Sequence, residues 1–175
     1  MRKLVVWMPF GVVAVLLATF AAGLLNPSDR AVASGMVGRT VPAFRLAGVR
    51  APDQGLETGY FADGKPRLLN IFASWCGPCV AEAPVLMDLQ RAGVEITGIA
   101  VHDRADDLRA FLARRGNPYS RIGMDPEGRA QIAFGSAGVP ETFVVNGRGT
   151  IVYQHIGIIT ANDVPIILAK LRRAG

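Results

Sequence analysis

The chain contains two cysteines, Cys76 and Cys79, and their spacing is typical of a redox-active pair. They stand in Trp75-Cys76-Gly77-Pro78-Cys79, where a short apolar run gives way to helical spacing. The unpaired N–H groups and partial positive charge of a helix N-terminus favour a thiolate, and a proline suits the first helical turn. Residues three apart share a helix face. The pattern therefore predicts that Cys76 is the exposed thiol that attacks a disulfide, and that Cys79 resolves the mixed disulfide.

A cysteine pair with this spacing has three other uses, and each fits the sequence less well. A structural disulfide across so short a loop would restrict the unfolded chain little. Haem attachment needs a histidine directly after the second cysteine, where this chain has Val80. A structural zinc site needs two further ligands close by, whereas His102 and His155 lie far off in the sequence. We therefore expect no metal and no cofactor, and we expect both histidines to be hydrogen-bonded residues at strand ends.

The apolar pattern around the cysteines predicts an α/β domain. Residues 67–73 and 95–101 form short, nearly continuous apolar runs, typical of strands buried on both faces. Strands alternate with helical patterns, which predicts parallel pairing, and a Gly-rich turn near the C-terminus predicts a final hairpin. The further expected elements are strands at 43–46, near Leu56, at 142–145 and at 151–155, an extended segment at 119–122, and helices at 76–91, 106–115, 127–134 and 161–173. Together they indicate a mixed sheet of four or five strands with helices on both faces.

The N-terminal segment is expected to reach a membrane. Residues 4–25 carry no charge over 22 positions, about 33 Å as a helix, and Arg2 and Lys3 precede them. This charge placement favours a cytoplasmic N-terminus and an exported domain, which in a bacterium means the periplasm. The length indicates a single-pass anchor in the inner membrane. The alternative is a cleaved secretory signal, with a small-residue triplet at 31–33.

This interpretation divides the chain into three parts. They are a membrane anchor over 1–25, a linker over 26–38 and a folded domain over 39–175. The apolar run is the only one of its length, which excludes a channel or a transporter with several spans.

The charge balance excludes a nucleic-acid-binding function. The chain has 19 Lys and Arg against 14 Asp and Glu. Without Arg2 and Lys3 the count is 17 against 14, a net charge of +3. The basic residues are scattered and are not interleaved with aromatic residues, as a nucleic-acid surface would require.

Several motifs beyond the cysteines resemble those of one family. Trp-Cys-Gly-Pro-Cys after a buried strand resembles thioredoxin, whose helix-kinking proline is matched by Pro84. Gly-Val-Pro-Glu-Thr at 138–142 matches the cis-proline loop. The segments 41–44 (Val-Pro-Ala-Phe) and 117–119 (Asn-Pro-Tyr) match the membrane-tethered branch. Over residues 37–172 the chain resembles the membrane-anchored thioredoxin-like thiol:disulfide oxidoreductases of cytochrome c maturation, the CcmG/DsbE/CycY type.

The resemblance implies a thioredoxin-like fold that places the substrate beside the cysteines. It implies a cis Val139–Pro140 bond facing the cysteine pair, with the backbone of Val139 pairing to an extended client as strand addition does. It also implies that Trp75 is a packing residue that borders the substrate groove.

The resemblance further implies a reductase with a particular client and donor. The client would be apocytochrome c, whose CxxCH cysteines are kept reduced for haem attachment. The electron donor would be a membrane thiol reductase of the DsbD/CcdA kind. The dipeptide Gly77-Pro78 between the cysteines is that of a reductant, so we expect a reducing couple.

One departure from thioredoxin concerns the proton acceptor. Thioredoxin carries a buried carboxylate six residues before its first cysteine, and this chain has Asn70 there. Glu82 lies three residues after Cys79, on its helix face, and is the first candidate to replace that carboxylate. Glu141, after the cis-proline position, is the second candidate. For each glutamate the alternative is an ordinary solvated surface position.

Two other functions stay open on the sequence alone. An anchored general thiol reductase of the same superfamily would serve other clients. A redox-inert assembly module would keep the fold without the exchange chemistry. The presence of both cysteines argues against the inert module.

Overall fold

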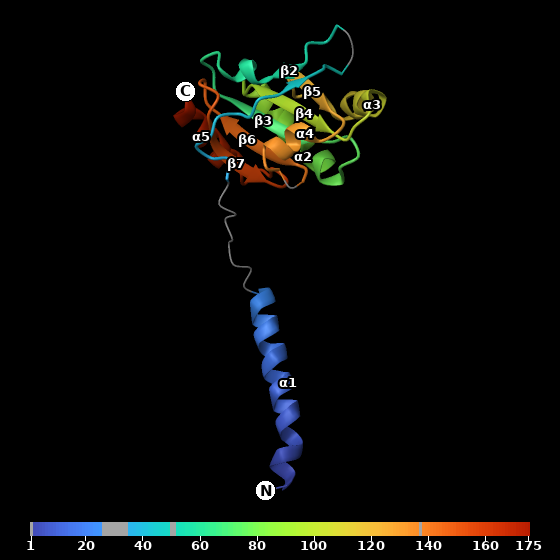
Figure 1. Ribbon diagram of the computed structural model, residues 1–175, viewed down its shortest axis with the longest axis vertical. Helices are drawn as coiled ribbons and strands as arrows, with labels where there is room; N and C mark the ends of the chain where they lie inside the picture. The colour runs from blue at the N-terminus through green and yellow to red at the C-terminus, as the bar shows by residue number, and fades with distance from the viewer. Residues whose placement is uncertain (1, 26–34, 50–51, 137) are drawn as a thin grey trace. The chain divides into compact units, whose positions relative to one another are not determined.

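The computed structural model describes residues 2–25, 35–49, 52–136 and 138–175, in two compact units, Met1–Ser34 and Gly35–Gly175. Helix α1 (Arg2–Leu25) belongs to the first unit (Figure 1). Among the described residues, no helix combines the length and the apolar character that a membrane span requires. The anchor over 1–25 stays a prediction. Most of the expected linker, and the small-residue triplet within it, lie outside the described residues.

The second unit carries the cysteines and consists of two sheets with helices between their strands. Its elements in chain order are β1 (Arg45–Leu46), β2 (Leu56–Glu57), the 3-10 helix η1 (Thr58–Phe61), β3 (Arg67–Phe72), α2 (Gly77–Arg91), β4 (Ile96–Val101), α3 (Ala105–Arg115), β5 (Arg121–Asp125), α4 (Arg129–Ala133), β6 (Glu141–Val145), β7 (Ile151–Ile156) and α5 (Val164–Ala174). β1 and β2 form a small antiparallel sheet of their own.

The central sheet has five strands in the order β5-β4-β3-β6-β7 (Figure 1). β3 and β5 both run parallel to β4, whereas β6 is antiparallel to both β3 and β7. All residues of β3 and β4 are buried, as expected for strands covered on both faces. The predicted mixed sheet and its final hairpin, β6–β7, are confirmed.

Helices α2 and α3 cover one face of this sheet. Side chains alternate along a strand, so Asn70 and Phe72 of β3 point to the same side. Asn70 bonds Glu82 of α2, and Phe72 lies against Phe111 of α3 with 6.2 Å between ring centroids. The same face therefore receives the helix that carries the cysteines.

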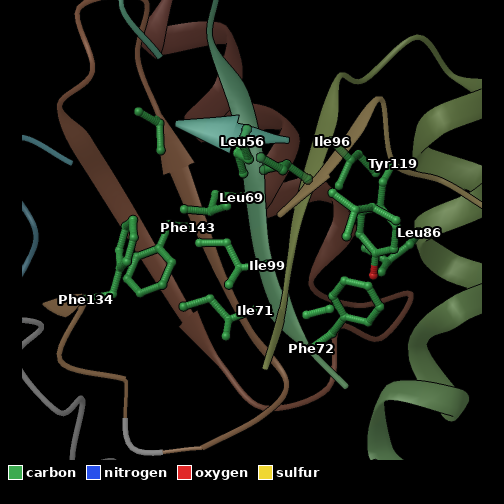
Figure 2. Packing of buried hydrophobic residues seen from close by; sticks show 14 of the residues in the cluster. Leu56, Leu69, Ile71, Phe72, Leu86, Ile96, Ile99, Tyr119, Phe134 and Phe143 are labelled. Atoms are coloured by element: carbon green, nitrogen blue, oxygen red, sulfur yellow. The ribbon is translucent and has the colours of Figure 1, made fainter. Parts of the chain in front are cut away.

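The opposite face is covered by α4. Phe143 of β6 packs on Phe134, the C-cap residue of α4, with 5.3 Å between ring centroids. Figure 2 shows Leu69, Ile71 and Phe143 on this side of β3 and Tyr119 on the other. The prediction of helices on both faces is confirmed.

Several elements begin later along the chain than the sequence predicts, and the structure gives the reason for two of them, β5 and α5. The extended segment expected at 119–122 is displaced to β5, because Tyr119 turns into the core instead of joining the strand. The last helix, expected from residue 161, begins after Asp163. The carboxylate of Asp163 accepts hydrogen bonds from the backbone N–H and the hydroxyl of Thr160, which holds a turn there.

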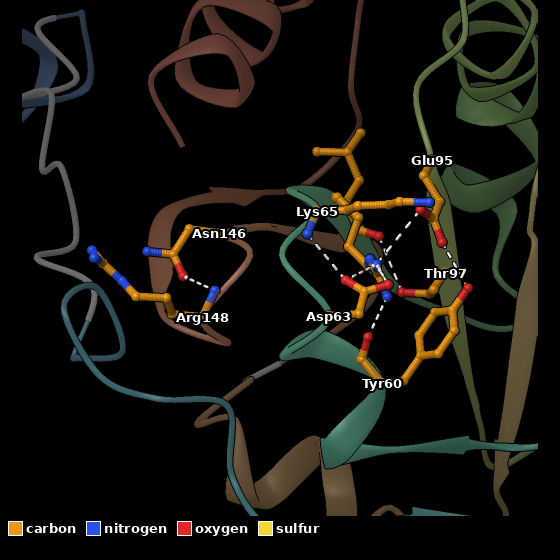
Figure 3. Close-up of polar contacts among 9 residues, drawn as sticks. Tyr60, Asp63, Lys65, Glu95, Thr97, Asn146 and Arg148 are labelled. Carbon is orange, nitrogen blue, oxygen red and sulfur yellow. Dashed lines mark hydrogen bonds and ion pairs between the residues drawn. The ribbon is translucent and has the colours of Figure 1, made fainter. Parts of the chain in front are cut away.

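A buried cation fixes η1 to the start of β3. Arg67 is fully buried, and its guanidinium lies 2.6 Å from the carboxylate of Asp63 and 3.6 Å from that of Glu95. The same guanidinium donates to the backbone oxygen of Tyr60 and stacks on the Tyr60 ring at 4.2 Å. Figure 3 shows Tyr60, Asp63 and Glu95 converging at this point. The hydrogen bond from Arg67 lowers the pKa of Asp63, so this carboxyl is ionised near neutral pH.

We expect Asp63→Asn to lower the free energy of unfolding by about 1–3 kcal/mol, because a buried guanidinium loses a charged partner. The matched control is Asp88→Asn, which breaks an ion pair with Arg91 whose two side chains are 68% and 70% exposed. That change should cost less than about 0.5 kcal/mol. Urea unfolding of both variants measures the difference, and equal losses would show that Arg67 does not depend on Asp63.

Candidate active site

The cysteine pair lies at the start of α2, just after the connection from β3. Cys76 is the N-cap residue of α2, and its Sγ accepts a hydrogen bond from the backbone N–H of Cys79 at 3.1 Å. The two residues form a disulfide, with 5.2 Å between their Cα atoms. Pro78 occupies the first turn, where a missing N–H costs no hydrogen bond. The predicted position at a helix N-terminus is confirmed, and a thiolate at Cys76 would lie at its positive end.

The expected exposure of Cys76 is wrong for the disulfide form. Cys76 is 4% exposed and Cys79 is 2% exposed, so exposure does not separate their roles. Cys76 is covered because its Sγ lies 3.7 Å from the carbonyl oxygen of Val139. The residues around it, Trp75, Gly77 and Pro78, are exposed and leave this edge of α2 open to an approaching chain. The assignment of Cys76 as the attacking sulfur therefore depends on its place at the helix end.

The loop that faces the cysteines contains a cis peptide bond. The Val139–Pro140 bond is cis, as the resemblance implied. The backbone oxygen of Pro140 accepts a hydrogen bond from the N–H of Gly157 at 3.0 Å, which ties the loop to the end of β7. The carbonyl of Val139, which belongs to the same cis bond, lies 3.7 Å from the Cys76 sulfur.

Trp75 differs from the expectation of a packing residue. It is 61% exposed, and its indole Nε1–H donates to the backbone oxygen of His102 at 3.1 Å. The preceding Ser74 is held by Asp103, whose carboxylate accepts from the Ser74 N–H at 2.6 Å and from its hydroxyl at 2.7 Å. These bonds fasten the β3–α2 connection to the end of β4. Sequence reasoning missed Asp103, although an acidic residue just after a buried strand is the signal that marks it.

Both histidines are hydrogen-bonded outside the cysteine site, as expected. His102 places Nδ1 3.2 Å from the backbone oxygen of Pro126, and His155 places Nε2 3.1 Å from that of Ile158. Within the described residues, no group of three or more His, Cys, Asp or Glu is arranged to hold a metal ion.

Glu82 lies on α2, the helix that begins at the cysteine pair, and it is fully buried, which excludes the surface alternative. One carboxyl oxygen accepts from the Asn70 side-chain N–H at 3.0 Å, and the other accepts from the Ile159 backbone N–H at 3.2 Å. Burial raises the pKa of Glu82 from 4.5 to about 7, and these two hydrogen bonds partly oppose the rise. A carboxyl with a pKa near neutral can take up and release a proton at working pH. It lies three residues beyond Cys79 on the helix, as the sequence predicts.

Glu141 is also buried, at 2% exposure, but it lies on the other face of the sheet. Its neighbour Thr142 accepts a hydrogen bond from Asn70 on the α2 face, and successive strand residues point to opposite faces. The Glu141 carboxylate accepts from the side-chain amide of Gln154 in β7. The structure therefore does not bring the two candidate glutamates together, and a proton-transfer role stays a prediction for each.

The sequence did not predict a cluster of polar side chains around Asn70. Asn70 Nδ2 donates to Glu82 and to the Thr142 hydroxyl, both at 3.0 Å, and Asn70 Oδ1 accepts from the Tyr119 hydroxyl at 2.8 Å. All four residues are buried. The available signal was a polar residue at the middle of an otherwise apolar strand, which must find partners when it is buried.

Comparison with known proteins agrees with this geometry. The sequence profile of the family described as Redoxin matches residues 36–171. The chain is similar to the thiol:disulfide interchange protein HelX of Rhodobacter capsulatus, 37% identical over 91% of this chain and 90% of HelX. It is also similar to the thiol:disulfide interchange protein DsbE of Vibrio cholerae, 34% identical over 98% of this chain and 95% of DsbE.

A solved structure shows the same fold. It is the thiol:disulfide interchange protein, a thioredoxin family protein, of Chlorobium tepidum. It has a TM-score of 0.61 and 26% identity, covering 77% of this chain and 94% of the Chlorobium chain. The second unit therefore has the thioredoxin-like fold that the resemblance implied.

The raised pKa of Glu82 gives a signed prediction for stability. The folded protein holds a proton on Glu82 up to about pH 7, whereas the unfolded chain releases it near pH 4.5. Stability from this group is therefore greatest below pH 4.5 and falls as the pH rises to 7. We expect the free energy of unfolding of the wild type, relative to Glu82→Gln, to fall by about 3 kcal/mol across this window. Urea unfolding at several pH values measures it, and a flat difference would show that the pKa of Glu82 is not raised in the folded state.

Proposed function

Since this chain belongs to the Redoxin family and is a thiol:disulfide oxidoreductase, we propose that it reduces the disulfide of CxxCH haem-attachment sites in apocytochrome c. The observation that carries the exchange chemistry is the Cys76–Cys79 disulfide at the N-terminus of α2, next to the Val139 carbonyl. The choice of client is supported by the motifs shared with the oxidoreductases of cytochrome c maturation and by the kinship with HelX and DsbE.

The reaction passes two electrons to the client in two exchanges. The Cys76 thiolate attacks one sulfur of the client disulfide, so a Cys76–client bond forms and the client's second sulfur leaves as a thiolate that takes up a proton. Cys79 then loses its proton and attacks the Cys76 sulfur. This step releases the client's first sulfur as a thiolate, which is protonated in turn. The client becomes a dithiol, and the protein becomes the Cys76–Cys79 disulfide seen in the structure.

Glu82 is suited to take the proton that Cys79 gives up. Each of its oxygens accepts one hydrogen bond and keeps a second lone pair for a proton. Its pKa of about 7 lets it accept that proton and release it again near neutral pH. Glu141 takes no step in this scheme, since it lies on the far face of the sheet.

Three residues near the sulfur are suited to hold the client. The exposed ring of Trp75 offers an apolar surface on one side of Cys76. Val139 and Pro140 offer a bent backbone on the other, to which an extended CxxCH segment could pair by strand addition.

The Cys76–Cys79 disulfide must be reduced again before the protein can reduce another client. A dithiol donor must attack Cys76 and leave the Cys76–Cys79 pair reduced. We assign this role to a membrane thiol reductase of the DsbD/CcdA kind, whose active site would face the same side of the membrane.

The location that suits this function is the periplasmic face of a bacterial inner membrane. The uncharged run at 4–25 would anchor the chain once through the bilayer, and Arg2 and Lys3 would keep the N-terminus in the cytoplasm. The domain would then lie where cytochromes c receive haem and where thiols are oxidised unless they are protected.

Trapping tests the cysteine roles and the client. We expect reduced Cys79→Ser to form a stable mixed disulfide with an oxidised CxxCH peptide, because Cys76 attacks and nothing resolves the adduct. Cys76→Ser is the matched control and should form no adduct. Mass spectrometry after alkylation of free thiols measures both.

The same experiment separates the competing functions. Equal trapping of a peptide with unrelated residues around its cysteines would favour a general reductase. An absence of adduct with every peptide would favour an inert assembly module. Equilibration of the wild type with glutathione gives the direction, and a strongly oxidising couple would contradict a reductase.

Reporter fusions test the topology. We expect a reporter that works only in the periplasm to be active when fused after Gly175, because the basic N-terminus stays in the cytoplasm. The fusion should stay with the membrane fraction. Activity of a cytoplasm-only reporter at the same site would contradict the proposal, and release into the soluble periplasm would indicate a cleaved signal.

A further inference from the structure

The Asn70 amide is the point at which four separate parts of the chain meet in the core. It lies on β3, at the centre of the sheet, and touches Glu82 of α2 and Thr142 of β6. Its third partner, Tyr119, comes from the loop before β5, 49 residues away in the sequence. A group with this many partners in the core can be oriented from several directions.

The chemistry of each partner decides which end of the amide must face it. An ionised carboxylate only accepts hydrogen bonds, so Asn70 must turn its N–H toward Glu82 to support that charge. The second N–H then reaches the Thr142 hydroxyl, and Oδ1 is left facing Tyr119. The Tyr119 hydroxyl donates to this oxygen, so both polar atoms of the amide have partners in this orientation.

Turning the amide over would break this arrangement. Asn70 Oδ1 would then face the Glu82 carboxylate, two acceptors would meet, and the Tyr119 hydroxyl proton would lose its acceptor. The direction of the Tyr119 bond therefore favours the orientation that supports an ionised Glu82. Bonds linked in one direction also polarise one another.

The fold makes a specific place for Tyr119. Its ring stacks on Phe72 with 4.5 Å between centroids and an interplanar angle of 21°. It crosses β4 at Gly98, where a Cβ would lie 3.0 Å from Tyr119 and 2.7 Å from Phe72. Gly98 pairs with Asn70 in the β3–β4 register, so the missing side chain opens the path to the amide. The Asn117 side chain accepts from the Tyr119 N–H at 3.0 Å and fixes the turn that delivers the ring.

We propose that Tyr119 is a positioning residue that holds the Asn70 amide with its N–H toward Glu82. This inference rests on the proposed function, since it assigns to Tyr119 a part in preparing the proton acceptor for the exchange. Tyr119 touches neither cysteine in this role and acts through Asn70.

The groups around Glu82 are consistent with this control. They are the Asn70 amide from β3, the Ile159 backbone N–H before α5 and the Tyr119 hydroxyl, with the cysteine pair on the same helix as Glu82. None of these groups is a cation, so neutral donors are what offsets the cost of a charge on Glu82. Burial and the Glu82 charge raise the pKa of Tyr119 well above its usual value, so its hydroxyl keeps the proton that it donates.

Tyr119→Phe tests the proposal because it removes the hydroxyl and keeps the stacked ring. Carboxyl ¹³C NMR of the oxidised full-length chain in detergent follows the titration of Glu82, which is assigned by the loss of its signal in Glu82→Gln. We expect the midpoint to rise by about half to one pH unit, since an unheld amide supports the charge less well. The pH profile of thiol–disulfide exchange should move in the same direction.

Two comparisons separate positioning from a general loss of structure. Tyr60→Phe removes a hydroxyl that donates to Glu95 at 2.7 Å, far from the cysteines, and should leave the Glu82 midpoint unchanged. Asn70→Ala should raise the midpoint by itself, and Tyr119→Phe added to it should raise it no further, because the route through Asn70 is already gone. A further rise in the double variant would overturn the proposed route.

One measurement uses the wild type, so it does not depend on whether the variants fold. The side-chain N–H signals of Asn70 should exchange slowly with solvent and should move as Glu82 titrates. Fast exchange, or an unmoved signal, would contradict the proposal, as would an unchanged Glu82 midpoint in Tyr119→Phe. The NMR readout needs no client. A shifted midpoint in a protein that fails to reduce CxxCH peptides would therefore disprove the client and uphold the role of Tyr119.

Discussion

The architecture around the disulfide depends on the burial of one carboxyl group, that of Glu82. A carboxyl withdrawn from water is costly unless donors reach it, and here the donors come from β3 and from the segment leading into α5. Glu82 accepts one hydrogen bond from Asn70 and one from Ile159. Together these two bonds fix α2 against the centre of the sheet. The N-terminus of α2 is then fixed as well, and with it Cys76 at 3.7 Å from the Val139 carbonyl. The burial that raises the pKa of Glu82 is thus the same contact that positions the sulfur.

The approach to the sulfur is built mainly from backbone and is therefore insensitive to many side chains. The helix N-terminus supplies N–H groups, the Val139 carbonyl lies against Cys76, and Gly157 holds that loop through its own N–H. Trp75 is the exception, because its ring is exposed while its indole N–H is tied to the end of β4. The surroundings of Cys76 therefore combine backbone groups with one exposed aromatic ring.

The sequence predicted those parts whose signals are local. The apolar runs of β3 and β4 are short, as buried strands are, and the cysteine spacing places the pair at a helix N-terminus. Glu82 lies at helical spacing from Leu86 and Leu89 on the buried face of α2, but the sequence also left a solvated surface position open for it. The polar cluster around Asn70 could not be predicted in this way, because the partners of Asn70 lie 12, 49 and 72 residues away. The cover over Cys76 is equally non-local, since it comes from a loop 63 residues later.

This chain departs from the thioredoxin pattern with an amide at residue 70 and an acid at residue 82. The two departures depend on each other, because the two side chains are in contact. These side chains lie 3.0 Å apart in the core, so carboxylates at both positions would repel each other, and one would stay protonated. With the acid on the helix, the strand position is left to a group that can donate to it. An amide can also accept a hydrogen bond, whereas a side chain that only donates cannot. The oxygen of the Asn70 amide accepts from the Tyr119 hydroxyl, which comes from the loop before β5. With the acid on the helix, Tyr119 in the loop before β5 reaches Glu82 through the Asn70 amide, and Glu82 is the group that we propose as the proton acceptor.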